Sequence, residues 1–203
     1  MNQNFNKLDK LMETGDGNIS RKDALANGVP PATFTRYVRL NQLVKIRHGV
    51  YAKTEGAIDD LYQFQRRYPK IVYSGITALY LLGLTDRIPD VMEFTVVKGY
   101  RVRKESAGSQ AICHIENNAE LFGMGNVNSK TIFGNIVTCF SKEKMVVEMI
   151  RKRDEYDSEL FLKALKTFLK GTDKHMDFLF EYARMRKIEE KVYRILEAMD
   201  YEN

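Results

Sequence analysis

The chain has 203 residues, of which 44% are hydrophobic and 29% are charged, and its formal net charge is +5. This length and composition are ordinary for one large or two small globular domains. No apolar run is long enough to span a bilayer, and the start, MNQNFNKLDK, lacks the apolar core of a signal peptide. We therefore expect a cytoplasmic protein without a membrane partner. Cys113 and Cys139 lie in apolar strand-like segments and are expected to be buried thiols.

The positive charge is concentrated at the N-terminal end. Residues 1–53 contain nine of the 32 Lys and Arg residues but only four of the 27 acids, so the whole excess lies there. An excess of positive charge attracts phosphate groups, which favours nucleic acid as the partner of this segment. The alternative is a basic face that only meets solvent.

The first 30 residues predict two helices. Apolar residues at helical spacing over 5–12 predict the first helix. Ser20 is placed to cap a second helix over 21–27, and Asp23, three residues later, completes a pair that resembles a capping box. Gly28 is the matching stop signal.

The stretch GVPPATFTRYVRLNQLVKIRHGVYA, residues 28–52, predicts a helix followed by a β-hairpin. Pro31 suits the first turn of a helix that ends near Asn41, because its φ is preset and its missing N–H costs nothing there. At 100° per residue, one face is mostly apolar and carries Phe34, Tyr37, Val38 and Asn41. The opposite face carries Ala32, Thr35, Arg36 and Arg39. A helix in a major groove needs one face that packs against its own domain and an opposite face that donates hydrogen bonds to the bases.

The residues after this helix predict a basic wing. Residues 43–47 alternate between apolar and basic, which is a strand signal, and His48-Gly49 suits a tight turn before a short return strand over 50–52. The complete order of helix, helix, turn, helix and hairpin is that of a winged helix-turn-helix. The expected DNA-binding residues are Arg21, Lys22, Thr35, Arg36, Arg39, Lys45, Arg47 and His48. The alternative is a winged helix that contacts protein.

The predicted fold class is α+β, with the winged helix over 1–56, a linker at 53–56, and a mixed domain with a helical C-terminal end over 57–203. Strands are expected over 71–73, 93–97, 111–115 and 131–140. Further helices are expected over 58–67, after Ser74 as a cap, from the Ser141 cap to 153, and over 157–170, 173–187 and 189–200.

Two basic runs in the second domain are candidate secondary DNA contacts. The first run is Arg66, Arg67 and Lys70, at the end of a predicted helix. The second is Lys98, Arg101, Arg103 and Lys104, in a loop-like segment. The alternative for each run is a solvated helix end or hairpin.

No motif for catalysis, a metal or a cofactor is present in the sequence. The chain has no P-loop and no complete dinucleotide fingerprint. Gly108-Ser109 is not followed by the Asp-x-Asp pair that a nucleotidyltransferase needs for its metals. The histidines, His48, His114 and His175, have no cysteine or carboxylate at metal-ligand spacing. We therefore expect no enzymatic activity, no metal and no cofactor.

Three blocks resemble the AbiEi family: the winged helix ending in RHGVY, then YSGITALYLLGLTDRIPD, and later CFSKEKMVVEMI. The family comprises the antitoxins of the AbiE abortive phage-infection systems of bacteria, which are type IV toxin–antitoxin pairs. The resemblance covers nearly the whole chain in order, and residues 74–86 are its most specific block. Family members often have an Arg-Thr-Leu-Val-Asp type segment where this chain has KMVVE, residues 144–148.

The resemblance implies two activities. The N-terminal domain would repress the operon promoter by binding inverted repeats in double-stranded DNA. The C-terminal domain would neutralise a nucleotidyltransferase-like toxin without forming a stable complex with it, and nucleotidyl transfer would belong to that partner. Two other functions stay open: an effector-responsive transcription regulator without antitoxin activity, and a DNA-processing enzyme, for which the sequence lacks the metal-binding carboxylates.

Overall fold

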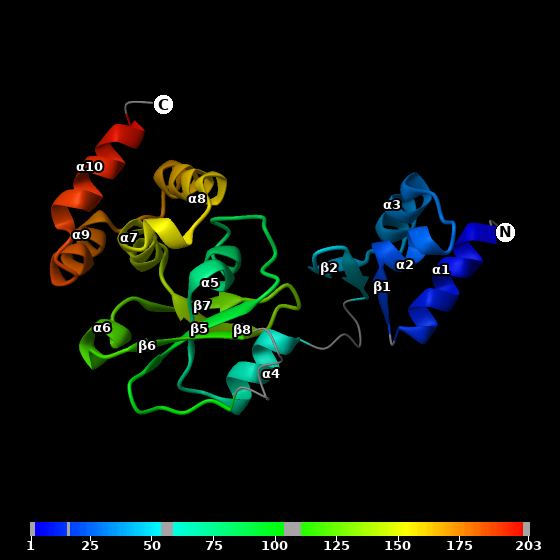
Figure 1. The fold of residues 1–203 in the computed structure, drawn as a ribbon, viewed down its shortest axis with the longest axis horizontal. Helices are drawn as coiled ribbons and strands as arrows, with labels where there is room; N and C mark the ends of the chain where they lie inside the picture. The colour runs from blue at the N-terminus through cyan, green and yellow to red at the C-terminus, as the bar shows by residue number, and fades with distance from the viewer. Residues whose placement is uncertain (1–2, 16, 54–58, 104–110, 201–203) are drawn as a thin grey trace. The chain divides into compact units, whose positions relative to one another are not determined.

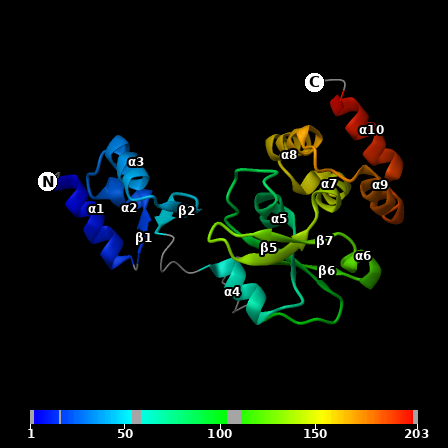
Figure 2. The ribbon, with the colours of Figure 1, turned by 180° about the vertical axis from the view of Figure 1, so that it is seen from behind.

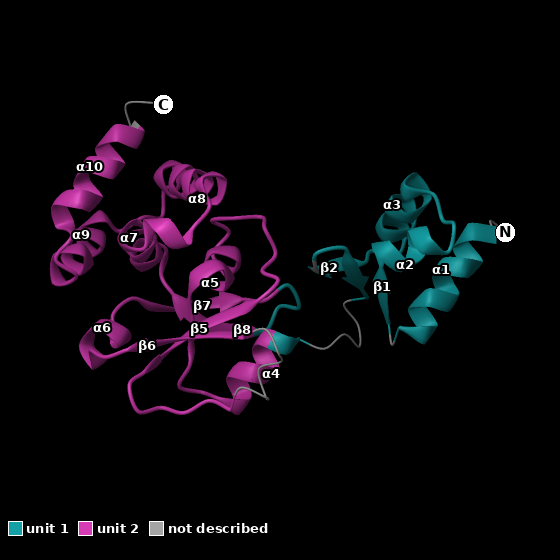
Figure 3. Cartoon of the chain, viewed as in Figure 1, with its two compact units in different colours: residues 1–60, 132–135 teal, residues 61–131, 136–203 magenta. Residues whose placement is uncertain are grey.

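The chain forms two compact units in the computed structural model, which describes residues 3–15, 17–53, 59–103 and 111–200 (Figure 3). Unit 1 comprises residues 1–60 and 132–135, and unit 2 comprises residues 61–131 and 136–203. Each unit encloses its own cluster of buried apolar side chains. The fold is α+β, as the sequence predicts. Apart from Lys53, the linker expected at 53–56 lies outside the described residues.

Unit 1 is a winged helix-turn-helix. Its helices are α1 (Gln3–Thr14), α2 (Arg21–Ala26) and α3 (Pro31–Leu40) (Figure 1). Its strands are β1 (Asn18–Ser20), β2 (Val44–Arg47) and β3 (Val50–Ala52), which form an antiparallel sheet in the order β1-β3-β2. Ser20 caps α2 as predicted, because its hydroxyl accepts the N–H groups of Lys22 and Asp23 at 3.1 and 3.4 Å.

Unit 2 is built on a mixed five-stranded sheet with the order β6-β5-β4-β8-β7. The strands are β4 (Val72–Tyr73), β5 (Met92–Val97), β6 (Ala111–Glu116), β7 (Asn126–Lys130) and β8 (Ile136–Phe140). β5 runs parallel to β6 and antiparallel to β4, whereas β8 runs parallel to β4 and antiparallel to β7. Since β4 and β8 share only one paired position, Gln65 supplies the missing hydrogen bonds by pairing its side-chain amide with both backbone groups of Thr138.

Helices flank this sheet and complete unit 2. They are α4 (Asp60–Arg67), α5 (Gly75–Leu81), α6 (Ala119–Gly123), α7 (Lys142–Arg151), α8 (Ser158–Lys170), α9 (Met176–Met185) and α10 (Glu189–Asp200), with a 3-10 turn, η2 (Arg153–Glu155), after α7. In Figures 1 and 2, α5 and α7 lie above the sheet and α4 lies below it. No helix of the described residues combines the length and the apolar character needed to cross a bilayer.

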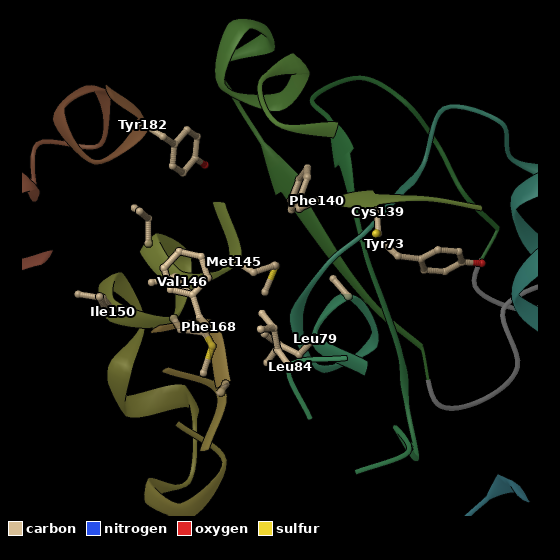
Figure 4. Close-up of a cluster of buried hydrophobic side chains, with 14 of the residues drawn as sticks. Tyr73, Leu79, Leu84, Cys139, Phe140, Met145, Val146, Ile150, Phe168 and Tyr182 are labelled. Carbon is tan, nitrogen blue, oxygen red and sulfur yellow. The ribbon is translucent and has the colours of Figure 1, made fainter. Parts of the chain in front are cut away.

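Helix α7 lies at the centre of unit 2. It contacts α5, α8, α9 and α10, and its residues from Glu143 to Ile150 are all buried. Val146, Val147 and Ile150 are fully enclosed, and Figure 4 shows Val146 and Ile150 among the surrounding apolar side chains. A helix that is buried all round is normally apolar all round. The charged residues of α7 therefore need partners inside the unit.

The structure corrects the expectations for unit 2 in three places. Of the strand predicted over 131–140, only residues 136–140 form a strand, β8, whereas residues 131–135 form the turn that joins it to β7 and in which Gly134 has a φ of 83°. Helix α6 was not predicted, because its signal is short: an Asn118 side chain that accepts two N–H groups of its first turn. Cys113 is exposed, since β6 is the edge strand of the sheet, whereas Cys139 is buried as expected.

Candidate functional site

Helix α3, the expected recognition helix, is held in unit 1 by two aromatic side chains. Phe34 and Tyr37 are each 2% exposed. The Phe34 ring packs edge-to-face on Tyr51 at 5.4 Å, which ties α3 to the wing strand β3. The Tyr37 hydroxyl donates a hydrogen bond to Asp9 Oδ1 of α1 at 2.6 Å. The apolar side of α3 is therefore buried where the sequence predicts it, although Asn41, expected on this side, is exposed.

The opposite side of α3 faces solvent. Ala32, Thr35, Arg36 and Arg39 are all exposed. Within the described part of the chain, neither Arg36 nor Arg39 forms an ion pair or a side-chain hydrogen bond, so both guanidinium groups are available to a ligand. The Thr35 hydroxyl donates to the Pro31 carbonyl at 3.0 Å, so it presents an acceptor rather than a donor to solvent. The two arginines thus provide the donors of this face.

The wing and the start of α2 lie beside each other in unit 1. The Arg21 N–H donates to the Gly49 carbonyl in the wing turn at 2.7 Å. Arg21 and Lys22 of α2, Lys45 of β2 and His48 of the turn are exposed. The strand pairing shifts by one residue between Lys45 and Arg47, which is a β-bulge in the wing. Arg47 lies at the end of β2, and its side chain is outside the description.

The two basic runs of unit 2 are also exposed where they are described. Arg66 and Arg67 end α4, and their guanidinium groups lie 5.8 and 5.9 Å from the ring centroids of Tyr62 and Tyr68. Lys70 follows in the next turn. Lys98, Arg101 and Arg103 follow β5 and are exposed, whereas Lys104 is outside the described residues.

Unit 2 contains a buried polar cluster that the sequence does not predict. Glu148 of α7 is 8% exposed and accepts hydrogen bonds on both carboxylate oxygens. Its Oε1 accepts the Tyr182 hydroxyl at 2.8 Å and lies 2.7 Å from Arg186 Nε. Its Oε2 accepts Nε and Nη2 of Arg151 at 3.0 and 2.7 Å. Arg186 also donates to Glu116 Oε2 at 2.5 Å, which links the end of α9 to strand β6.

The charges of this cluster stabilise one another. Burial opposes the charged form of Glu148, but the hydrogen bond from Arg151 and the charge of Arg186 hold the pKa of its carboxyl below the usual value. Burial likewise opposes the charge of Arg186, and the Glu148 carboxylate nevertheless keeps the pKa of that guanidinium above its usual range. Burial and the adjacent Glu148 raise the pKa of Tyr182, so its hydroxyl is a permanent donor at neutral pH.

Lys144 is completely buried one turn before Glu148 on α7. Its ammonium donates to the carbonyls of Leu121, Phe122 and Met124 at 2.7, 3.3 and 2.8 Å, at the C-terminal end of α6. It also lies 3.6 Å from the centroid of the Phe140 ring. Burial lowers the pKa of Lys144 to about 7, while the Glu148 carboxylate acts in the opposite direction.

A cavity of about 140 Å³ lies against this cluster. Its lining includes Gly75, Thr95, His114 and Tyr156 as well as the charged residues Glu116, Glu148 and Arg186. At its edge, Glu93 Oε2 lies 3.2 Å from His114 Nε2 and Glu93 Oε1 accepts the Ile76 N–H at 3.4 Å. Gly75 has a φ of 55°, and the Glu93 carboxylate occupies the space that a Cβ there would need.

The Glu93 contact corrects the expected role of Ser74. Ser74 does occupy the N-cap position of α5, but its side chain accepts no N–H from the helix. Instead, its hydroxyl accepts the Thr95 hydroxyl at 2.9 Å, and Glu93 reaches the first turn of α5. Within the described residues, no three His, Cys, Asp or Glu side chains are placed to hold a metal ion.

The residues of the buried cluster are far apart in sequence. Glu116 comes from β6, Glu148 from α7, Tyr182 from α9, and Arg186 directly follows α9. Local periodicity therefore does not connect all four. A signal was nevertheless present: Lys144 and Glu148 interrupt an otherwise apolar segment, KMVVEMI, that is expected to be a core helix. A charged residue on a core helix needs a buried partner. The sequence does not identify that partner.

Comparison with known proteins gives a fold and no family. No family model matches the chain, and no curated protein matches it. Among solved structures, the crystal structure of the RV2827C protein from Mycobacterium tuberculosis is similar, with a TM-score of 0.54 and 14% sequence identity. The match covers 95% of this chain and 75% of that chain. At this identity the likeness shows a shared fold, and its coverage extends over both units.

Proposed function

We propose that the chain is the antitoxin and transcriptional autorepressor of a bacterial abortive-infection toxin–antitoxin operon. Unit 1 would bind inverted repeats in the operon's own promoter, and unit 2 would neutralise a nucleotidyltransferase-like toxin in the cytoplasm. The proposal involves no enzymatic activity of this chain, no metal and no cofactor. The toxin half of the proposal is supported by the resemblance of the sequence blocks to the AbiEi family.

The observation that carries the DNA half of the proposal is the arrangement of α3. Its back is held by Phe34 and Tyr37, and its front presents Arg36 and Arg39 without an ion pair among the described residues. An arginine that reads guanine uses two of its guanidinium donors for the base, and these donors must be free of other partners. The exposed Arg21, Lys22 and Lys45 extend the basic surface around this helix. Such a surface supplies phosphate contacts beside the base contacts.

Arg39→Ala tests this function. We expect operator affinity to fall by about 1–3 kcal/mol, with relaxed sequence preference, because one arginine–guanine contact is lost. Competition binding against random DNA measures both effects. In cells, promoter repression is expected to fall while rescue from the toxin persists, since unit 2 is unchanged. Arg194→Ala, at an exposed position of α10, is the control and is expected to preserve affinity and rescue.

Two results would contradict this assignment. An equal loss of affinity on operator and random DNA would make Arg39 a phosphate contact. If Arg39→Ala lost both promoter repression and rescue from the toxin, neutralisation of the toxin would belong to unit 1.

The wing gives a second test. Replacing Lys45 and Arg47 together by alanine is expected to weaken binding on all sequences, because the wing meets the DNA backbone or the minor groove. The slope of log affinity against log salt is expected to flatten by roughly two, about 0.9 for each lost phosphate contact. Titration at several salt concentrations measures this slope. The charge-matched control is Lys170→Ala with Lys191→Ala, two exposed lysines of unit 2. An unchanged slope in the wing variant would show that the wing does not contact DNA.

A second candidate function is an effector-responsive regulator without antitoxin activity. The cavity of about 140 Å³ in unit 2 favours it, because a polar cavity provides a place for an effector. Intact repression with no rescue of cells that express the partner toxin would support this second function. Rescue by the full-length chain would support the first.

A further inference from the structure

The proposed function does not account for the charged residues that line the cavity of unit 2. Its lining includes two carboxylates, Glu116 and Glu148, but three cationic side chains, Arg151, Lys152 and Arg186. His114 adds an imidazole to the same lining. Glu93 at the edge of the cavity and Glu155, which pairs with Lys152, balance these cations, so the attraction for an anion comes from the donors that the carboxylates leave free.

The acidic groups around the cavity are fully engaged by the protein. Both oxygens of Glu148 accept side-chain donors from Arg151, Tyr182 or Arg186. Glu116 accepts the Asn118 N–H on Oε1 and Arg186 on Oε2. The third carboxylate, Glu93 at the edge, contacts His114 and the Ile76 N–H. The protein thus already supplies donors to these carboxylates, and few acceptors remain for the donors of a ligand.

Donors, in contrast, remain available. Arg151 and Arg186 use Nε and Nη2 on their carboxylates, and neither Nη1 has a hydrogen-bond partner in the described part of the chain. The Lys152 ammonium donates to Glu155 and retains two further protons. The Tyr156 hydroxyl has no hydrogen-bond partner among the described residues. Burial and the nearby Glu93 raise the pKa of Tyr156, so this hydroxyl keeps its proton at neutral pH.

The remaining wall is apolar. Its apolar side chains are Ile115, Phe140 and Met145, and they can contact the non-ionic part of a ligand. We propose that this cavity binds a small phosphorylated molecule, with the phosphate at Arg151, Lys152 and Tyr156 and its remainder against the apolar wall. A phosphate monoester carries close to two negative charges and three acceptor oxygens at neutral pH, which matches several separate donors better than a single carboxylate does. This inference goes beyond the proposed function and does not depend on it.

The test measures binding of phosphorylated probes to the full-length protein. Inorganic phosphate, a set of nucleoside monophosphates and a set of sugar phosphates would be compared with the matching nucleosides and sugars by calorimetry and by thermal unfolding. We expect the phosphorylated probes to bind and to raise the midpoint of unfolding, with sodium chloride of equal ionic strength as the reference. Lys152→Met is expected to weaken binding about tenfold, through loss of one charged hydrogen bond. Tyr156→Phe is expected to weaken it about threefold, through loss of one neutral hydrogen bond.

Matched controls separate the cavity from the rest of the surface. Lys142 begins α7, and Lys152 follows the end of that helix. The Lys142 side chain is 27% exposed in an ion pair with Asp173, against 24% for Lys152 in its pair with Glu155. Lys142→Met and Tyr193→Phe are therefore expected to bind the probes like the unmodified chain. No stabilisation by any phosphorylated probe beyond sodium chloride would overturn the proposal, as would equal losses in Lys152→Met and Lys142→Met. Binding that disappears in Arg39→Ala would place the probe on the winged helix and would also overturn it.

Discussion

Glu148→Ala is expected to lower the free energy of unfolding of unit 2 by about 3–5 kcal/mol, the cost of breaking a buried ion pair by removing one partner. The carboxylate accepts from Arg151 and Tyr182 and lies against Arg186, whose side chain is only 15% exposed. Without it, Arg186 keeps Glu116 as a carboxylate partner and the Tyr182 hydroxyl as an acceptor at Nε, but loses its second carboxylate. The Tyr182 hydroxyl, on a fully buried side chain, loses its acceptor as well.

Chemical denaturation followed by circular dichroism measures this loss, and amide hydrogen exchange locates it in α7 and α9. Glu190→Ala is the control, since Glu190 pairs with Arg194 on the exposed side of α10. An exposed pair of this kind contributes about 0–1 kcal/mol. Equal losses in the two variants would contradict the central role of Glu148.

The same variant also has a functional consequence under the proposed division of labour. The core of unit 1 is formed by Leu8, Ile19, Phe34 and their neighbours, and it shares no residue with the core of unit 2. Glu148→Ala is therefore expected to reduce toxin rescue in cells while operator binding by α3 persists. Loss of operator binding in this variant would show that the DNA contact requires an intact unit 2.

Much of unit 1 could be predicted from sequence because its determinants are local. Ser20 caps the helix that begins at the next residue, Pro31 begins another helix, and residues 43–47 alternate as a strand does. Each of these features depends on neighbours within four or five residues. The exposed position of Arg36 and Arg39 follows from helical geometry once Phe34 and Tyr37 are recognised as the buried side.

The site in unit 2 could not be predicted in the same way. The partners of Glu148 lie 34 and 38 residues later along the chain at Tyr182 and Arg186, and only the packing of α9 on α7 brings them together. At Ser74 the sequence identifies the helix start correctly, but tertiary structure replaces the local cap with the Glu93 carboxylate. The strand predicted over 131–140 is correct only over 136–140, because the apolar residues before Gly134 belong to a turn and those after it to β8.

Lys144→Met is expected to remove a pH dependence from the stability of unit 2. In the folded chain burial lowers the pKa of Lys144 to about 7, whereas in the unfolded chain a lysine titrates near 10.4. Between these values the unfolded chain binds a proton at this residue that the folded chain does not bind. The free energy of unfolding therefore rises with pH between these values, by about 1.4 kcal/mol per pH unit. Below pH 7, this lysine contributes no pH dependence.

The measurement is the difference in unfolding free energy between the unmodified chain and Lys144→Met at pH 7, 8, 9 and 10. Taking the difference cancels the other groups, including Tyr182, whose raised pKa makes stability fall once the unfolded tyrosine ionises. From pH 7 to pH 10, the unfolding free energy of the unmodified chain is expected to rise by about 3–4 kcal/mol relative to that of the variant. Lys142→Met, in an ion pair near the surface on the same helix, is the control and is expected to give a flat difference. If the difference for Lys144→Met were also independent of pH, Lys144 would stay protonated in the folded chain throughout this range. The reason would be its three hydrogen bonds to the carbonyls of Leu121, Phe122 and Met124, which require all three protons of the ammonium.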